Sequence, residues 1–387
     1  MPIIIIILFA LWTVMFFEPF RNLICGQKYM AKQNADNNKV TVNKDKEDDL
    51  NESIAKAVDS LSQEQLTGQL LMVGFNGKVP DNNVEQMINL RYAGGIILYG
   101  RNIETKGQLT ELISELQKMS LTKLNLPLFI AVDQEGGPVS RLKGLITEFP
   151  APSNLGKLSG DEVALVAQTT AKELKSIGIN VNLAPVLDVA DNKSIMAGRA
   201  YGGDPSVVAE KGVAAVNGYQ QGGIIACGKH FPGLGSAVQD THTVSIKISS
   251  NLDSLNKRDL IPFRQAIQNG IKMILVSHAV YPALDSQNPA SLSYIIQTGI
   301  LRNMLDYQGL ILSDDLEMAA AESAGTVGQN AVRAIKAGAD IVLVCHTPEK
   351  QKKAYEALLS AVKSGEISQE RLKETVKRIV TLKLIEQ

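Results

Sequence analysis

The sequence predicts an α/β fold, a single (β/α)8 TIM-like barrel, behind an apolar N-terminal segment. Two observations predict the barrel. Short β-rich apolar runs alternate eight times with helical patterns, and the runs are apolar throughout, as strands buried on both faces are. A doubly wound open sheet is the alternative, but no G-x-G-x-x-G motif follows the first run and no Walker lysine is present, which weakens its nucleotide-binding form.

The expected strands are the runs that carry branched and aromatic apolar residues between turn residues. They span residues 70–75, 95–99, 126–132, 179–189, 223–228, 272–277, 309–312 and 340–344. Amphipathic patterns between these runs predict helices. The main expected helices span residues 105–119, 161–177, 205–221, 255–269, 290–306 and 326–337.

The composition of the 387 residues limits the kind of protein. Apolar residues make up 45% and charged residues 20%, which suffices for a large core and argues against disorder. Lys+Arg 39 against Asp+Glu 40 gives a net charge of −1, so nucleic acid is not an expected partner. Three scattered cysteines, Cys25, Cys227 and Cys345, predict neither a disulfide framework nor a zinc site.

Three parts of the chain differ in composition. Residues 1–26 form an apolar signal or membrane-anchor segment, in which residues 2–17 carry no charge and would reach about 24 Å as a helix. Residues 27–60 are a polar tether rich in Asn, Lys, Asp and Glu, and residues 61–387 are the barrel domain. We therefore expect a membrane-associated or exported (periplasmic or extracytoplasmic) protein that contacts the membrane through its N-terminal segment, with the orientation open.

Ionisable side chains recur directly after the expected strands. In a barrel of this kind the chemistry gathers at the carboxyl ends of the strands. The residues found there include Arg101, Asp133, Glu135, Asp188, Lys229, His230, His278, Asp314, Asp315 and His346. One polar residue after a strand is usually a cap or a turn former, but their presence at six or more strand ends indicates a functional rim.

The stretch CGKHFPGLGSAVQDTH, residues 227–242, is the strongest local signal. Its strand delivers Lys229 and His230 to the rim, and a glycine-bearing loop then presents Asp240 and His242. A carboxylate two residues from an imidazole can orient the ring and raise its basicity, which suits general acid/base catalysis near neutral pH. The alternative is a glycine-bearing loop with a solvated histidine.

Two further stretches place carboxylates at the rim. In GLILSDDLEM, Asp314 follows an apolar strand directly, whereas Asp315 could instead cap the next helix. In AVDQEGGPVSRL, Asp133 can accept hydrogen bonds from two vicinal hydroxyls, and Arg141 offers a planar cationic fork. The alternative for this stretch is a charged loop with a surface ion pair.

Together these motifs resemble glycoside hydrolase family 3, in its β-N-acetylglucosaminidase (β-hexosaminidase) branch. The stretches that carry the resemblance are VDQEGGPVSR, LAPVLDVA, GRAYGGDP, GKHFPGLG…DTH and SDDLEM. Leu234 stands where the family commonly has histidine, Pro138 where it commonly has arginine, and Thr241 where it commonly has serine. These departures concern loop conformation and fine specificity more than activity.

The resemblance implies a retaining exo-β-N-acetylhexosaminidase that needs no cofactor. Asp314 would form a covalent glycosyl-enzyme with terminal β-linked N-acetylglucosamine, and His242, assisted by Asp240, would act first as acid and then as base. The sugar-binding residues that it implies are Asp133, Arg141, Arg199, Lys229 and His230. Supporting groups with a less definite role are Asp188, Asn182 and His278.

Other interpretations stay open at this point. A glycosyl phosphorylase could use the same nucleophile, and a metal-dependent barrel hydrolase could use the four histidines, His230, His242, His278 and His346. The single tryptophan, Trp12, lies in the apolar segment, so the domain lacks the tryptophan platforms typical of long polysaccharide clefts. We therefore expect a monomer with a small exo-acting pocket for short, cell-wall-derived glycans. The choice between N-acetylglucosamine and N-acetylgalactosamine stays open.

Overall fold

The computed structural model describes residue 52 and residues 54–238 and 246–385. The apolar segment and the tether up to residue 51 lie outside the described residues, and so do Asp240 and His242.

The compact unit that contains the barrel runs from Glu52 to Gln387. Residues 54–59 are helical, and Ile54 and Val58 of this short helix are buried in the core. The domain therefore includes a helical segment ahead of residue 61, where the sequence predicted its start.

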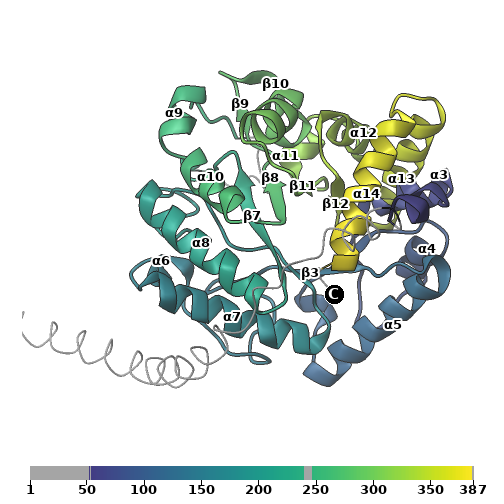
Figure 1. The fold of residues 1–387 in the computed structure, drawn as a ribbon, viewed down its shortest axis with the longest axis horizontal. Helices are drawn as coiled ribbons and strands as arrows, with labels where there is room; N and C mark the ends of the chain where they lie inside the picture. The colour runs from purple at the N-terminus through teal and green to yellow at the C-terminus, as the bar shows by residue number, and fades with distance from the viewer. Residues whose placement is uncertain (1–51, 53, 239–245, 386–387) are drawn as a thin grey trace, which may run out of the picture. The chain divides into compact units, whose positions relative to one another are not determined.

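Eight parallel strands close into a barrel, which confirms the predicted fold class (Figure 1). In chain order they are β1 (Leu71–Val73), β2 (Gly95–Leu98), β3 (Phe129–Val132), β6 (Val181–Asn182), β7 (Ile225–Phe231), β8 (Met273–Val276), β11 (Leu310–Asp315) and β12 (Ile341–Val344). Neighbours in the barrel follow this order, and β12 pairs with β1 to close the sheet. Each of the eight predicted runs overlaps one of these strands.

The run predicted over residues 179–189 is longer than the strand that forms in it. Only Val181–Asn182 is strand, and Val186 makes an isolated bridge to Lys229 further along. Pro185 accounts for the interruption, because proline has no N–H to donate to a ladder.

Helices connect the strands and surround the barrel (Figure 1). The α-helices are α3 (Gln63–Gln69), α4 (Asn82–Asn89), α5 (Lys106–Leu124), α6 (Pro152–Leu155), α7 (Gly160–Ile177), α8 (Pro205–Gln221), α9 (Leu252–Lys257), α10 (Leu260–Gln268), α11 (Ala319–Glu322), α12 (Val327–Ala337), α13 (Pro348–Lys363) and α14 (Gln369–Ile385). Three further helical segments are η1 (Gly100–Asn102), η2 (Ala290–Leu292) and the π-helix η3 (Ile295–Met304). Two short antiparallel pairs lie outside the barrel sheet: β4 (Gln134–Gly136) with β5 (Val139–Ser140), and β9 (Val280–Tyr281) with β10 (Asp285–Pro289).

Local sequence explains where helices begin and end. α7 starts with a capping box at Ser159 and ends at Gly178, whose φ of 99° lies in the left-handed region that glycine tolerates. The helix predicted over residues 255–269 is divided into α9 and α10 at Arg258. Pro262 explains the division, because its missing N–H is harmless in the first turn of α10 but would break one continuous helix.

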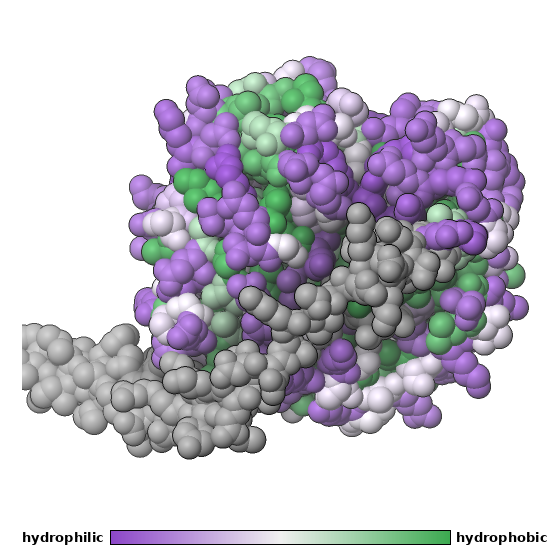
Figure 2. All heavy atoms as spheres, viewed as in Figure 1, coloured by the Kyte–Doolittle hydropathy of each residue, from purple (hydrophilic) through white to green (hydrophobic). Residues whose placement is uncertain are grey.

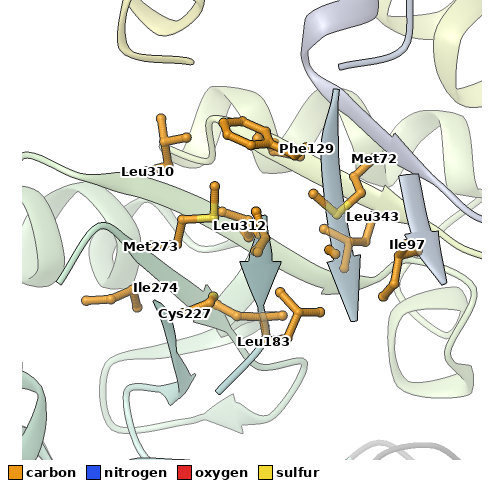
Figure 3. Packing of buried hydrophobic residues seen from close by; sticks show 14 of the residues in the cluster. Met72, Ile97, Phe129, Leu183, Cys227, Met273, Ile274, Leu310, Leu312 and Leu343 are labelled. Atoms are coloured by element: carbon orange, nitrogen blue, oxygen red, sulfur yellow. The ribbon is translucent and has the colours of Figure 1, made fainter. Parts of the chain in front are cut away.

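Apolar side chains from the strands fill the barrel interior (Figure 3). Met72, Phe129, Leu312 and Leu343 are among those that meet there. Cys227 also belongs to this core, and both it and Cys345 are buried free thiols. A close-packed interior of this kind gives the strand ends a rigid base.

Hydrophilic residues cover most of the face shown in Figure 2, with smaller apolar areas between them. This agrees with helices that pack one apolar side on the barrel and expose the other. Within the part of the chain that the structure describes, no helix combines the length and the apolar character needed to cross a membrane.

Candidate active site

A cavity of about 300 Å³ lies at the carboxyl ends of the barrel strands. Its lining residues are Ile97, Tyr99, Asp133, Val139, Arg141, Leu183, Arg199, Lys229, His230, Leu275, Asp314, Asp315, Glu317, Met318, Leu343 and His346. The apolar ones come mostly from within or directly after the strands, and the charged ones cluster around the strand ends. The cavity thus combines an apolar floor with a charged rim, as small-molecule sites usually do.

Two strands deliver charged residues to this cavity through β-bulges. The pairing of β7 with β8 slips by one residue between residues 228 and 231, and the pairing of β11 with β12 slips by one between residues 312 and 315. Lys229 and His230 lie in the first bulge and Asp314 in the second. A bulge bends its strand and changes the direction of its side chains. This helps to bring both Lys229 and His230 to the cavity from β7, and Asp314 from β11.

Lys229 is the centre of a buried ion network. Its Nζ lies 2.6 Å from Asp133 Oδ1 and 2.7 Å from Glu135 Oε1. Arg199 holds the same Glu135 with a bidentate pair, Nη2 to Oε1 at 2.7 Å and Nε to Oε2 at 2.9 Å. Glu135 thus holds both Lys229 and Arg199 in place, and Lys229 in turn holds Asp133. These charge-assisted bonds fix the positions of Asp133 and the two cations at the cavity.

The network fixes the charges of its members. Burial raises the pKa of Glu135, but the nearby Lys229 and Arg199 outweigh this effect and lower it to about 2. Burial lowers the pKa of Lys229, but Asp133 and Glu135 outweigh it and raise that pKa above its usual value. Lys229 is therefore a permanent cation at neutral pH.

Arg141 borders the cavity beside Tyr99. Its Nη2 lies 3.7 Å from Asp133 Oδ2, and its guanidinium carbon lies 5.6 Å from the centre of the Tyr99 ring. Arg101 stacks on the same ring at 4.4 Å and donates through Nη2 to Cys345 O at 2.7 Å. The ring thus lies close to two guanidinium groups, which favours cation–π contacts.

His230 is oriented by a buried carboxylate. Its Nδ1 lies 2.7 Å from Asp188 Oδ2, and Asp188 is fully buried. Asp188 Oδ1 also accepts from Leu234 N at 2.6 Å. This bond holds the loop after β7 and uses the backbone N–H of Leu234, so it does not depend on the leucine side chain. The side chain itself is buried in the core. Pro138, a second departure, is exposed at the turn between β4 and β5, and the third, Thr241, lies outside the described residues.

Asp314 lines the cavity from β11, and its Oδ1 accepts from Asp315 N at 2.9 Å. Asp315 does not cap a helix. Its Oδ1 accepts from Glu317 N at 3.1 Å and from Cys345 N at 3.2 Å, and its Oδ2 lies 3.2 Å from His346 Nε2. Asp315 therefore stabilises the turn that follows Asp314.

Like Asp188, the other two supporting residues named from the sequence contact the backbone beside the cavity. Asn182 is fully buried and exchanges two hydrogen bonds with the backbone of Gln134, at 3.0 and 2.9 Å, which fixes the chain next to Asp133. His278 is also fully buried and contacts the backbone of Asp315.

The three described histidines are engaged with different partners. His230 pairs with Asp188, His278 with Ser291 and a backbone carbonyl, and His346 with Asp315. Among residues 54–238 and 246–385, no group of three or more His, Cys, Asp or Glu side chains is arranged to hold a metal ion.

Residues 62–382 match the sequence model of the family described as "Glycosyl hydrolase family 3 N terminal domain". The chain belongs to this family. It is therefore a glycoside hydrolase, as the motifs predicted. A protein of Nitrosomonas eutropha named Beta-hexosaminidase is 37% identical over 328 residues, which are 82% of this chain and 93% of that protein.

Solved structures agree with this assignment. A family 3 β-N-acetylglucosaminidase from Paenibacillus sp. has a TM-score of 0.83 and 39% identity, and the match covers 84% of this chain and 63% of that one. A β-N-acetylhexosaminidase from Beutenbergia cavernae has a TM-score of 0.79 and 28% identity, and the match covers 84% of this chain and 99% of that one.

In this family 3 chain, six of the site residues named from the sequence line one cavity: Asp133, Arg141, Arg199, Lys229, His230 and Asp314. Asp240 and His242 lie outside the described residues. Sequence reasoning assigned no role to Glu135 or Tyr99, and it considered His346 only as a metal ligand, although all three lie at or after the ends of predicted strands. For Glu135, the signal was its place two residues after Asp133 in the same motif.

Proposed function

We propose that this family 3 enzyme is a retaining exo-β-N-acetylhexosaminidase that removes terminal β-linked N-acetylglucosamine from short glycans. The observation that carries the proposal is that Asp314 lines the same small cavity as the ion network around Lys229. The names of the similar proteins, Beta-hexosaminidase and β-N-acetylglucosaminidase, support the choice of sugar.

The proposed reaction has two displacement steps. Asp314 attacks the anomeric carbon and forms a glycosyl ester, while His242, assisted by Asp240, gives a proton to the departing oxygen. Water then attacks the same carbon from the opposite face, His242 takes its proton, and Asp314 leaves. Two inversions give overall retention of the β configuration.

The chain on both sides of the proposed acid/base residues is anchored. Leu234 N donates to Asp188 Oδ1 at 2.6 Å, and Ile248 N donates to Val280 O at 2.8 Å. These bonds hold described residues on either side of Asp240 and His242 beside the segments that follow β6 and β8, which supports a role for the two residues close to the strand ends.

The charged residues of the cavity suit a sugar that carries several hydroxyl groups. Asp133 offers acceptor oxygens, whereas Lys229, Arg141 and Arg199 are donors only. Since these groups already hold one another in place, a sugar hydroxyl meets oriented partners. A cavity of about 300 Å³ is at the small end for ligand sites, which supports the exo-acting mode on one terminal sugar.

The test is hydrolysis of aryl β-N-acetylglucosaminide and β-N-acetylgalactosaminide by wild type and Asp314→Asn. We expect Asp314→Asn to lower kcat/KM by about 10⁴-fold or more, because an amide is a poor nucleophile. Asp306→Asn is the matched control, since Asp306 is exposed and lies before β11 rather than at its end. Unchanged hydrolysis by Asp314→Asn would refute the proposal.

We also propose that the enzyme is exported or membrane-associated through residues 1–26, with the polar residues from 27 to about 51 as a tether. We further propose that it works as a monomer and that its substrates are cell-wall fragments. The uncharged apolar run at residues 2–17 supports the targeting. Labelling of intact cells with a membrane-impermeant reagent tests it, and a domain that is labelled only after lysis would contradict an extracytoplasmic location.

A further inference from the structure

We propose that His278 is a positioning residue that holds the backbone beside Asp314 and so sets the direction of the Asp314 carboxylate. This inference rests on the proposed role of Asp314 as the nucleophile. His278 follows β8 and is fully buried behind the cavity lining. It therefore acts through the chain of β11 and does not touch the sugar.

Both ring nitrogens of His278 have partners. Nε2 lies 2.8 Å from Asp315 O, and because a carbonyl oxygen only accepts, Nε2 carries the hydrogen. Nδ1 lies 2.6 Å from Ser291 Oγ and, in the neutral ring, accepts from that hydroxyl. Ser291 is fixed in turn, because Gln297 Nε2 donates to its carbonyl oxygen at 2.6 Å. The imidazole thus has one orientation and one tautomer.

The hydrogen bond from His278 to Asp315 joins the two chains just beyond the point where the regular pairing of β8 with β11 ends. β8 and β11 pair regularly up to Val276 and Ser313. Asp314 follows Ser313 inside the bulge toward β12, and the carbonyl of Asp315 comes directly after it. Through the His278 side chain, the segment that follows β8 therefore holds the chain after Asp314, and β8 itself holds the chain before it.

The neighbouring strand β12 holds the same turn from the other side. Leu316 N donates to Leu343 O at 2.9 Å, and Cys345 N donates to Asp315 Oδ1 at 3.2 Å. Asp314 therefore lies between backbone segments that are restrained from both sides.

Such restraint affects the rate more than the affinity for the sugar. The attacking oxygen has to lie about 3–3.5 Å from the anomeric carbon and in line with the leaving group, and a displacement of about 1 Å can cost about 100-fold in rate. The proposed sugar-binding residues Lys229, Asp133 and Arg199 lie on other segments. Loss of the His278 bond should therefore lower kcat and leave KM nearly unchanged.

The test compares wild type, His278→Met and His278→Gln on 2,4-dinitrophenyl N-acetyl-β-glucosaminide, whose leaving group departs without a proton. Methionine removes the hydrogen bond, whereas the glutamine amide can reach the position of Nε2. We expect His278→Met to lower kcat about 100-fold with KM within threefold, and His278→Gln to regain at least tenfold. A kcat of His278→Met within threefold of wild type, or no recovery in folded His278→Gln, would overturn the proposal.

A second pair of variants serves in case the His278 variants do not fold. Ser291→Ala keeps the imidazole but removes the group that orients it, and we expect kcat to fall about fivefold. Ser293→Ala is the matched control, since Ser293 is equally buried and next to η2, but its Oγ accepts from Ile296 N instead. Equal kcat values for Ser291→Ala and Ser293→Ala would overturn the proposal.

The same assay separates this inference from the proposed function. An active Asp314→Asn variant would refute the role of Asp314 itself. An inactive Asp314→Asn variant together with fully active His278 and Ser291 variants would refute only the positioning role.

Discussion

Two lysines are buried at opposite ends of this barrel. Lys229 lies at the carboxyl ends of the strands, where Asp133 and Glu135 pair with it. Lys383, in α14, is only 3% exposed, yet no described carboxylate pairs with it. Both amines are buried away from solvent, but of the two only Lys229 has carboxylate partners among the described residues.

The surroundings of Lys383 are nearly apolar. Its Nζ donates to Gln69 Oε1 at 2.8 Å and lies 5.1 Å from the centre of the Phe129 ring. Gln69 precedes β1 and Phe129 begins β3, so this amine lies at the amino ends of the strands. In a (β/α)8 barrel, that end serves stability rather than chemistry.

The pKa values of the two amines move in opposite directions. Burial alone lowers the pKa of Lys383 to about 7, because desolvation disfavours the charged form. At Lys229 burial acts in the same direction, but Asp133 and Glu135 outweigh it and raise the pKa. The comparison teaches that carboxylate partners, and not depth, keep the lysine of the cavity charged.

Lys229→Met should have the largest effect of the three substitutions, and it tests whether the two buried lysines differ in their importance for catalysis. It removes a donor of the cavity and leaves the buried Glu135 and the partly buried Asp133 short of a cation, so we expect kcat/KM to fall about 10³-fold. Lys383→Met makes the same change at the other end and should keep kcat/KM within twofold of wild type. Steady-state kinetics of both variants measure this, and equal losses would contradict the assignment of chemistry to one end.

Glu135→Gln tests how much the Glu135 carboxylate contributes to the stability of the folded protein. The pKa of Glu135 is about 2 in the folded protein against an ordinary value of 4.5, so its stabilisation is complete above pH 4.5 and is lost as the pH falls toward 2. That contribution amounts to about 3 kcal/mol at most. We expect the urea midpoint of wild type to fall more steeply than that of Glu135→Gln between pH 4.5 and 2.5. Parallel profiles would count against the ion network.

Lys383→Met should change the pH dependence of stability in the alkaline range. Because the pKa of Lys383 is about 7 when folded and about 10.5 when unfolded, the unfolded chain binds more protons between these values. The cost of burying the charged amine is therefore complete below pH 7 and is relieved as the pH rises, by up to about 1.4 kcal/mol per pH unit. Wild type should gain stability relative to Lys383→Met from pH 7 to 9 in urea unfolding. A constant difference over that range would show that Lys383 stays charged.

The two lysines also differ in how well the sequence predicted them. Each strand was visible as an apolar run, and Lys229 and Asp133 were recognisable because polar residues directly after buried strands have a known place in a barrel. Lys383 was not recognisable, because a lysine in an amphipathic helix is ordinarily solvated and only tertiary packing of α14 against the barrel buries it.

The bulges in β7 and β11 were equally invisible, since a register slip depends on the neighbouring strand and leaves no local pattern. The division of the helix over residues 255–269 was different in kind. Pro262 was present in the sequence as a signal for it.

The most direct measurement of the central claim is trapping with a fluorinated N-acetylglucosaminide, followed by peptide mass spectrometry. A fluorinated sugar slows the second displacement, so a covalent glycosyl-enzyme accumulates. The proposed mechanism predicts one added sugar on the peptide that contains Asp314, and none in Asp314→Asn. A sugar attached to another residue, or normal hydrolysis without any covalent adduct, would contradict it.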